Sequence, residues 1–157
     1  MRLRPATAGD EPFLRAVYAS SRADELALTD WNEQQKAAFC DQQFSAQDSH
    51  YRAHYPGAEF SIVELEGTPA GRLYVDRWEA EIRIMDIVLL PQFRRAGLGT
   101  ELLRELQREA TAAGKSLTIH VERFNPALTL YQRLGFVVRE EKGVYQLMEW
   151  RGAPPIS

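Results

Sequence analysis

The chain has little cysteine, no long apolar run and no excess of positive charge. Cys40 is the only cysteine among 157 residues, which excludes an intrachain disulfide and leaves no cysteine-based metal site. No apolar run approaches the ~20 residues that span a bilayer, and the first residues lack the apolar core of a signal peptide. The net charge of −3 argues against a partner held by nucleic-acid phosphates. We therefore expect a cytoplasmic protein that binds neither membranes nor nucleic acid.

A histidine-based zinc helix is also missing. His50 and His54 are spaced to share one helix face, but Tyr51 stands where the pattern His-Glu-x-x-His requires glutamate. We expect no metal site. The hydrophobic share of 45% is that of an ordinary globular protein with a sizeable core. The length predicts a single domain over residues 1–157, with residues 151–157 as a loose tail.

The most informative stretch is an apolar run over residues 82–90, followed by a turn with two glycines. The helix predicted after it, over residues 98–113, has leucines at helical spacing on one face and charged residues on the other. Gly97 and Gly99 lie where this helix begins, and Arg94 and Arg95 precede them. Unpaired N–H groups at a helix start bind anions, and glycines allow a phosphate to approach the backbone closely. The turn therefore predicts a site for a pyrophosphate, although it fits neither the P-loop nor the dinucleotide-binding pattern.

The remaining periodicities complete an alternating order of elements. The pattern predicts a short first strand over residues 2–6 and a helix that begins near Asp10. Residues 21–30 are either a loop or the frayed end of this helix, and two helices follow over residues 31–44 and 45–55. A hairpin over residues 60–65 and 70–76 follows, then the strand and helix above, a strand over 116–122, a helix capped by Asn125, and a closing hairpin over 136–138 and 144–150. The crossover through helix 98–113 implies one parallel strand pair in an otherwise antiparallel sheet.

Two motifs resemble those of the Gcn-type N-acetyltransferase (GNAT) superfamily. Arg94-Arg95-Ala96-Gly97-Leu98-Gly99 is similar to the acetyl-CoA loop of that family, Gln/Arg-x-x-Gly-x-Gly/Ala. The run from Ile119 to Phe136 resembles the second signature, which is a strand, an asparagine, a short helix with a tyrosine, and Gly-Phe. The resemblance covers essentially the whole chain. It implies a mixed α/β fold with a central, mostly antiparallel sheet, one splayed parallel strand pair, and flanking helices.

The resemblance also implies where acetyl-CoA binds, namely where strands 82–90 and 116–122 splay apart. Backbone groups of Ile87, Val88 and Leu89 would pair with the pantetheine arm. Asn125 would bond to the pantetheine or to the strand ends, and Tyr131 would also contact the cosubstrate. The arginine pair adds positive charge, and the pyrophosphate would be held by N–H groups of the loop, so the implied loop residues are Arg94, Arg95, Ala96, Gly97, Leu98, Gly99 and Thr100.

Acetyl transfer to an amine needs a proton acceptor for the ammonium and a proton donor for the departing thiolate. Within the family frame, Tyr131 is the candidate acid, against the alternative that it is a core aromatic. His120 is the candidate base because its pKa near ~6.5 suits proton removal at neutral pH. A partly exposed strand histidine without a chemical role is the alternative. Glu122, Asp86 and Glu81 are weaker candidates for the base.

We therefore expect an acetyl-CoA-dependent N-acetyltransferase that acts by direct transfer to a primary amine of a small molecule or a protein. Acetyl-CoA and the amine acceptor are the expected partners, and a homodimer is left open. The alternative function is a non-catalytic domain that binds or senses acyl-CoA. Such a domain would keep Gly97 and Gly99 but would not need Tyr131.

Overall fold

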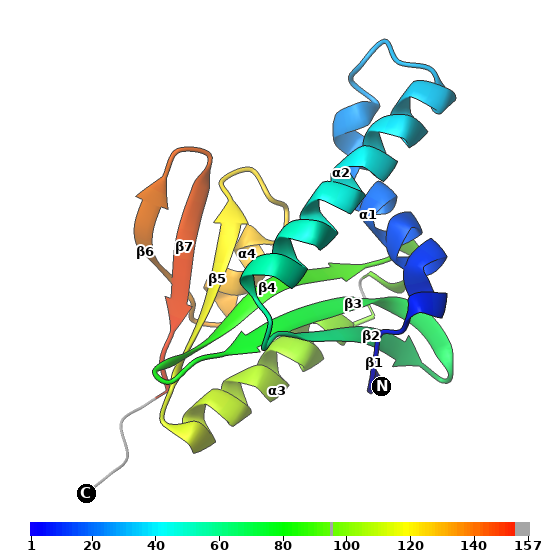
Figure 1. Cartoon of the computed structure of the whole chain (residues 1–157). Coiled ribbons are helices and arrows are strands. Elements are labelled where there is room, and N and C mark those ends of the chain that lie inside the picture. The colour runs from blue at the N-terminus through cyan, green and yellow to red at the C-terminus, as the bar shows by residue number, and fades with distance from the viewer. Residues whose placement is uncertain (95, 153–157) are drawn as a thin grey trace, which may run out of the picture. The chain divides into compact units, whose positions relative to one another are not determined.

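A computed structural model of the chain describes residues 1–94 and 96–152. In this part of the chain the strands form one seven-stranded sheet in the order β1-β2-β3-β4-β5-β7-β6. The pair β4–β5 is parallel, whereas β1–β2, β5–β7 and β6–β7 are antiparallel. The predicted mixed α/β class is confirmed. The elements, shown in Figure 1, are β1 (Arg2–Pro5), η1 (Ala8–Asp10), α1 (Glu11–Leu26), α2 (Glu33–His54), β2 (Glu59–Leu65), β3 (Thr68–Arg77), β4 (Glu81–Leu89), η2 (Pro91–Phe93), α3 (Leu98–Ala113), β5 (Ser116–Glu122), α4 (Leu128–Arg133), β6 (Val137–Lys142) and β7 (Tyr145–Trp150).

The chain forms two compact units. The first comprises Met1–Tyr74 and Ile87–Arg95, and the second comprises Val75–Asp86 and Ala96–Ser157. Strands β3 and β4 contribute residues to both units. The expectation of a single domain over residues 1–157 stays a prediction.

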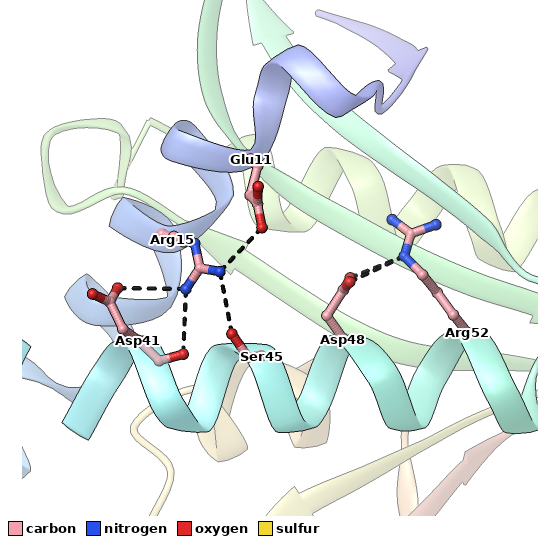
Figure 2. A network of polar contacts seen from close by, with 6 residues as sticks. All are labelled: Glu11, Arg15, Asp41, Ser45, Asp48 and Arg52. Atoms are coloured by element: carbon pink, nitrogen blue, oxygen red, sulfur yellow. Dashed lines mark hydrogen bonds and ion pairs between the residues drawn. The ribbon is translucent and has the colours of Figure 1, made fainter. Parts of the chain in front are cut away.

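In the first unit, helices α1 and α2 pack against each other through an arginine as well as through apolar side chains (Figure 2). The Arg15 guanidinium donates to the carbonyl oxygen of Asp41 at 3.2 Å and to Oγ of Ser45 at 3.2 Å. It also donates to Glu11 at 3.0 Å, and it lies 4.7 Å from the ring centroid of Phe44. One side chain of α1 thereby contacts about one turn of α2, from Asp41 to Ser45.

One sequence expectation about these helices is wrong. Helix α2 is continuous over Glu33–His54, where two helices had been predicted over residues 31–44 and 45–55. Neither glycine nor proline interrupts the sequence there, and Ser45 bonds to Arg15 instead of breaking the helix. The helix begins at a capping box, in which Asn32 accepts a bond from the Gln35 N–H at 2.8 Å. Helix α1 continues to Leu26, so the first part of residues 21–30, which the sequence left open between a loop and a helix end, belongs to the helix.

The hairpin β2–β3 brings β3 unusually close to β4 within the first unit. Gly71 of β3 is buried, and a Cβ atom there would overlap the carbonyl oxygen of Val88 and lie 2.9 Å from Cα of Leu89. The Leu90 N–H donates to the carbonyl oxygen of Ala70 at 2.8 Å. The absence of a side chain at residue 71 therefore sets the position of the β4 backbone at Val88 and Leu89.

The second unit is built on the parallel pair β4–β5 and on helix α3. Both predicted elements around the crossover are confirmed, and α3 packs on β5. The helix buries the predicted apolar face. Gly114, with φ of 68°, ends the helix as the predicted left-handed C-cap. The buried apolar residues of α3 and of the two strands are Leu98, Leu102, Leu103, Leu106, Ala110, Ile82, Ile84, Leu117, Ile119 and Val121.

The start of helix α4 differs from the prediction. The sequence placed its N-cap at Asn125, but α4 spans Leu128–Arg133 and its N-cap is Ala127. Asn125 instead stabilises the turn before the helix, where its side-chain oxygen accepts a bond from the Ala127 N–H at 2.8 Å. After α4, strands β6 and β7 form the predicted closing hairpin, and β7 lies between β5 and β6 (Figure 1). The predicted loose tail at 151–157 lies, from residue 153 onward, outside the described residues.

We predict that Gly71→Ala destabilises the protein. The new methyl group must displace the backbone of β4, so we expect a loss of about 1–3 kcal/mol in the free energy of unfolding, measured by urea denaturation. Gly9→Ala is the matched control, because its Cβ would meet only Oγ1 of Thr7 at 3.7 Å. Equal stability changes in the two variants would contradict the close approach of β3 and β4.

Candidate active site

Strands β4 and β5 pair only along their first halves. The parallel register runs from Glu81 opposite Ser116 to Ile84 opposite Ile119. Both strands continue beyond this last pair, β4 to Leu89 and β5 to Glu122. His120 therefore directly follows Ile119, the last residue of β5 in the register with β4. Within the second unit the parallel pairing thus ends at Ile84 and Ile119, and the splaying of the two strands that the resemblance implied stays a prediction.

The start of α3 has the backbone conformation that requires glycine. Gly97 is the N-cap and adopts φ of 80° and ψ of 3°, in the left-handed region. A Cβ atom at this residue would meet no atom within 4 Å, so the space beside the first turn is open. The first N–H groups of an α-helix have no partner within the helix, and those of Leu98, Gly99 and Thr100 belong to this set. The phosphate site at this helix start stays a prediction. Ala96 is exposed, and Arg95 lies outside the described residues.

The predicted cosubstrate residues before the loop glycines lie on β4 and in the segment after it, in the first unit. Ile87, Val88 and Leu89 are half-buried. Arg94 is exposed, and its Nε donates to the carbonyl oxygen of Leu89 at 3.0 Å. Its positive charge is therefore fixed at the C-terminal end of β4.

Tyr131 is buried on α4, with 4% of its surface exposed. Its ring packs edge-to-face on Phe136, with 5.7 Å between the ring centroids. Burial raises the pKa of the Tyr131 phenol well above its ordinary value, and the negative charge of Asp86 raises it further. The phenol is therefore protonated throughout the neutral pH range.

His120 is exposed, and its Nδ1 lies 3.2 Å from Nη1 of Arg83. Loss of hydration where neighbours cover the ring lowers the pKa of His120, and the positive charge of Arg83 lowers it further. The imidazole is therefore neutral at pH 7. The second unit thus contains a protonated phenol at Tyr131 and a neutral imidazole at His120.

The carboxylates that the sequence offered as alternative bases differ in their surroundings. Glu81 accepts bonds from the Thr118 hydroxyl at 2.5 Å and from Arg83 at 3.3 Å. Glu122 accepts a bond from the Tyr145 hydroxyl at 3.5 Å. Asp86 lies two residues beyond the last paired residue of β4, and its Oδ2 is buried.

Sequence reasoning missed Arg83 and Thr118. The signal was a charged residue within the mostly apolar run of β4, but only the strand register shows what it contacts. Arg83 stands opposite Thr118 in the parallel pair, and His120 lies two residues further along β5. Side chains two residues apart share one face of a strand. The three polar side chains therefore lie together.

In residues 1–94 and 96–152, no three His, Cys, Asp or Glu side chains gather into a group that could hold a metal ion. The rings of His50 and His54 stack with 4.4 Å between centroids, and Nδ1 of His54 lies 3.1 Å from the carbonyl oxygen of His50. No helix in the described part of the chain is both long and apolar enough to cross a membrane.

Comparison with known families and proteins finds a family match and curated relatives from Mus musculus and Homo sapiens with partial coverage. Residues 22–136 match the model of the acetyltransferase (GNAT) family. The cysteine-rich protein 2-binding protein of Mus musculus is 40% identical to this chain over 89 residues, which are 55% of this chain and 11% of that protein. The chain therefore spans only a small part of the length of this relative.

Solved structures with low sequence identity share the fold. The PaiA N-acetyltransferase of Thermoplasma acidophilum, in complex with coenzyme A, has a TM-score of 0.71 at 18% identity, and the match covers 94% of this chain and 96% of that one. The ribosomal-protein-alanine N-acetyltransferase of Brucella melitensis has a TM-score of 0.61 at 21% identity, over 96% of this chain and 99% of that one.

We predict that Tyr131 makes the protein sensitive to alkali. A tyrosine in the unfolded chain ionises near pH ~10, whereas the folded state keeps Tyr131 neutral. Stability contributed by a raised pKa is complete below the unfolded value and is lost as the pH rises above it. The free energy of unfolding should therefore fall less steeply above pH ~10 in Tyr131→Phe than in the unchanged protein. Tyr145→Phe, which alters an exposed tyrosine, is the control; a Tyr131→Phe curve that matches the unchanged protein would refute the assignment.

Proposed function

Since this chain belongs to the acetyltransferase (GNAT) family, we propose that it transfers the acetyl group of acetyl-CoA directly to the amine of a small molecule or a protein. The observation that carries this proposal is the parting of β4 and β5 beyond Ile84 and Ile119, in a chain whose family match extends over residues 22–136. Beyond their last pair, strand edges can offer backbone groups to a ligand, as they do to an added strand. The coenzyme A complex of a structural neighbour supports the choice of cosubstrate.

We assign the cosubstrate contacts as follows. Backbone groups of Ile87, Val88 and Leu89 pair with the pantetheine arm. The N–H groups at the start of α3 hold the pyrophosphate, which the left-handed Gly97 and the open space beside it favour. Arg94 and Arg95 supply positive charge. Asn125 lies in the turn between β5 and α4, where its side-chain oxygen already accepts a bond from Ala127, so its amide group is the part assigned to the ligand.

In the proposed reaction the amine nitrogen attacks the thioester carbonyl, a C–N bond forms, and the C–S bond breaks. The transfer needs no covalent enzyme intermediate, because a thioester is already a reactive acyl donor. Tyr131 gives its phenolic proton to the departing thiolate. Its raised pKa keeps the phenol protonated at neutral pH but also makes it a weaker acid, so we assign the proton transfer to the moment at which the C–S bond breaks and the thiolate charge develops.

His120 is the proposed base that takes the proton from the acceptor ammonium. Its lowered pKa has two consequences. The ring is already neutral and able to accept a proton at pH 7, and it binds that proton only weakly once it is transferred. The base is thus ready at neutral pH, and it is quickly regenerated.

We predict that acetyl-CoA stabilises the protein by mass action. At about a hundredfold excess over its dissociation constant the gain is roughly 2.7 kcal/mol, measured as a rise in Tm. Gly99→Val should abolish this gain, because a branched side chain in the first turn of α3 would block the phosphates. Gly9→Val is the control and should keep the full shift. A Gly99→Val protein that still gains full stability would contradict the phosphate site.

We predict that Tyr131→Phe slows acetyl transfer and hardly changes acetyl-CoA affinity. Loss of one proton donor should reduce kcat by about 10²–10⁴-fold. The assay is the release of free thiol from acetyl-CoA across a panel of amines, with calorimetry for the affinity. An unchanged kcat would show that Tyr131 only packs in the core. Tight binding of acetyl-CoA with no transfer to any amine would instead favour the acyl-CoA-sensing function.

We predict that kcat/KM falls on the acid side of neutrality as His120 becomes protonated. Because its pKa is lowered, this fall should lie below the ordinary histidine value of about 6.5. His120→Ala should remove the fall and reduce the rate at neutral pH, and a pH close to the pKa of the acceptor should restore part of it. A variant with an unchanged pH profile would assign proton removal to water or to a carboxylate.

A further inference from the structure

The Arg83 side chain is held in one orientation by several neighbours in the second unit. Its Nε donates to Oγ1 of Thr118 at 2.8 Å, and its Nη2 donates to Oε2 of Glu81 at 3.3 Å. The guanidinium carbon lies 4.8 Å from the ring centroid of Trp78. Only 12% of the side chain is exposed. The direction of the remaining donor, Nη1, is therefore fixed as well, and it points at His120.

The hydrogen bonds of this cluster have only one consistent direction. A guanidinium has five N–H donors and no acceptor, so the Thr118 oxygen must accept from Arg83. The single proton of the Thr118 hydroxyl is then donated to Oε2 of Glu81 at 2.5 Å, a much shorter contact than the one to the carbonyl oxygen of Ile82 at 3.5 Å. The carboxylate balances the charge of the guanidinium and fixes the hydroxyl. Each group in the cluster therefore supports the orientation of Arg83.

The same argument determines the proton on His120. Nη1 of Arg83 lies 3.2 Å from Nδ1, and an arginine in a protein cannot give up its proton. Nδ1 must therefore be the acceptor in this bond. A neutral imidazole has one N–H group and one acceptor nitrogen, so its proton lies on Nε2.

We propose that Arg83 is a positioning residue that fixes the imidazole of His120 as its Nε2–H tautomer, with Nδ1 as the nitrogen that accepts a proton. Protonation of Nδ1 breaks the bond from Arg83 and places two cations side by side. Arg83 cannot move away without losing its bonds to Thr118 and Glu81. The arginine therefore favours the neutral ring and promotes the release of a bound proton.

The other charged groups that act on His120 do not cancel this effect. Glu81 on β4 and Glu140 on β6 raise the pKa of His120, whereas Arg83 on β4 and Lys142 on β6 lower it. Arg83 is the charge with the largest influence, and its cationic group lies within hydrogen-bond distance of the ring. The consequence for catalysis rests on the proposed function: Arg83 sets the pH at which His120 becomes available as the base.

The tautomer can be tested in the unmodified protein. The chain has three histidines, so ¹⁵N-histidine labelling gives few signals, and His120→Ala identifies those of His120. Two-bond ¹H–¹⁵N correlation spectra should show His120 with its proton on Nε2 alone, and a titration should place its midpoint below the ordinary value. A proton on Nδ1 in the unmodified protein would overturn the proposal without any variant.

Arg83→Met and Arg83→Lys test the cause. Methionine removes every donor, so both tautomers should appear and the midpoint of His120 should move to higher pH. Lysine keeps the charge but lacks the planar group that bonds Thr118, Glu81 and His120 together, so it should also lose the single tautomer. Arg77→Met is the matched control, because Arg77 pairs with Glu109 at 2.6 Å and 3.0 Å, and it should change neither property of His120. Unchanged tautomer and midpoint in both Arg83 variants would refute the role of Arg83.

Kinetics separate this inference from the proposed function. In Arg83→Met, the decrease of kcat/KM at acid pH should move to higher pH together with the titration midpoint of His120 measured by NMR. In Arg77→Met, neither should move. If the NMR midpoint moves and the pH profile does not, Arg83 still positions His120, and the proposed role of His120 as the base is wrong.

Discussion

The parallel pairing of β4 with β5, and the point at which it ends, is the constraint on which the rest of the site depends. Pairing over Glu81–Ile84 and Ser116–Ile119 fixes the register of the two strands. That register brings Arg83 beside Thr118 and places His120 directly beyond the last pair. Helix α3 connects the two strands and packs on β5. Its N-cap, Gly97, lies on the β4 side of this connection. One strand pair therefore determines both the polar cluster and the helix start.

Loss of hydration shifts the pKa values of both proposed proton-transfer groups, and the two shifts have opposite directions. It raises the pKa of buried Tyr131 and lowers that of His120, because in each case it disfavours the charged form. A neighbouring charge reinforces each shift: Asp86 acts on the tyrosine and Arg83 on the histidine. At neutral pH the phenol of Tyr131 is protonated and the imidazole of His120 is neutral. This separation is the pattern expected of an acid and a base in one reaction.

The sequence was informative where a local pattern decides the structure. The leucine spacing of α3, the glycine that follows it and the crossover to residues 116–122 predicted the helix, its left-handed end at Gly114 and the parallel pair. It was less informative where partners are distant in the chain: Arg83 contacts Thr118 and His120, which lie 35 and 37 residues away, only because of the strand register. Continuous α2 was missed because Ser45 can end a helix or bond to Arg15 within one. Asn125 was placed at a helix cap because its local side-chain bond, here to Ala127, serves a turn equally well.

The central claim is that acetyl-CoA binds where β4 and β5 part. A crystal structure of the protein with coenzyme A tests it most directly. The account predicts pantetheine along the backbone of residues 87–89 and the pyrophosphate on the N–H groups of residues 97–100, with β4–β5 pairing that ends at Ile84 and Ile119. Pairing that continues to the ends of both strands, or coenzyme A bound away from α3, would contradict it.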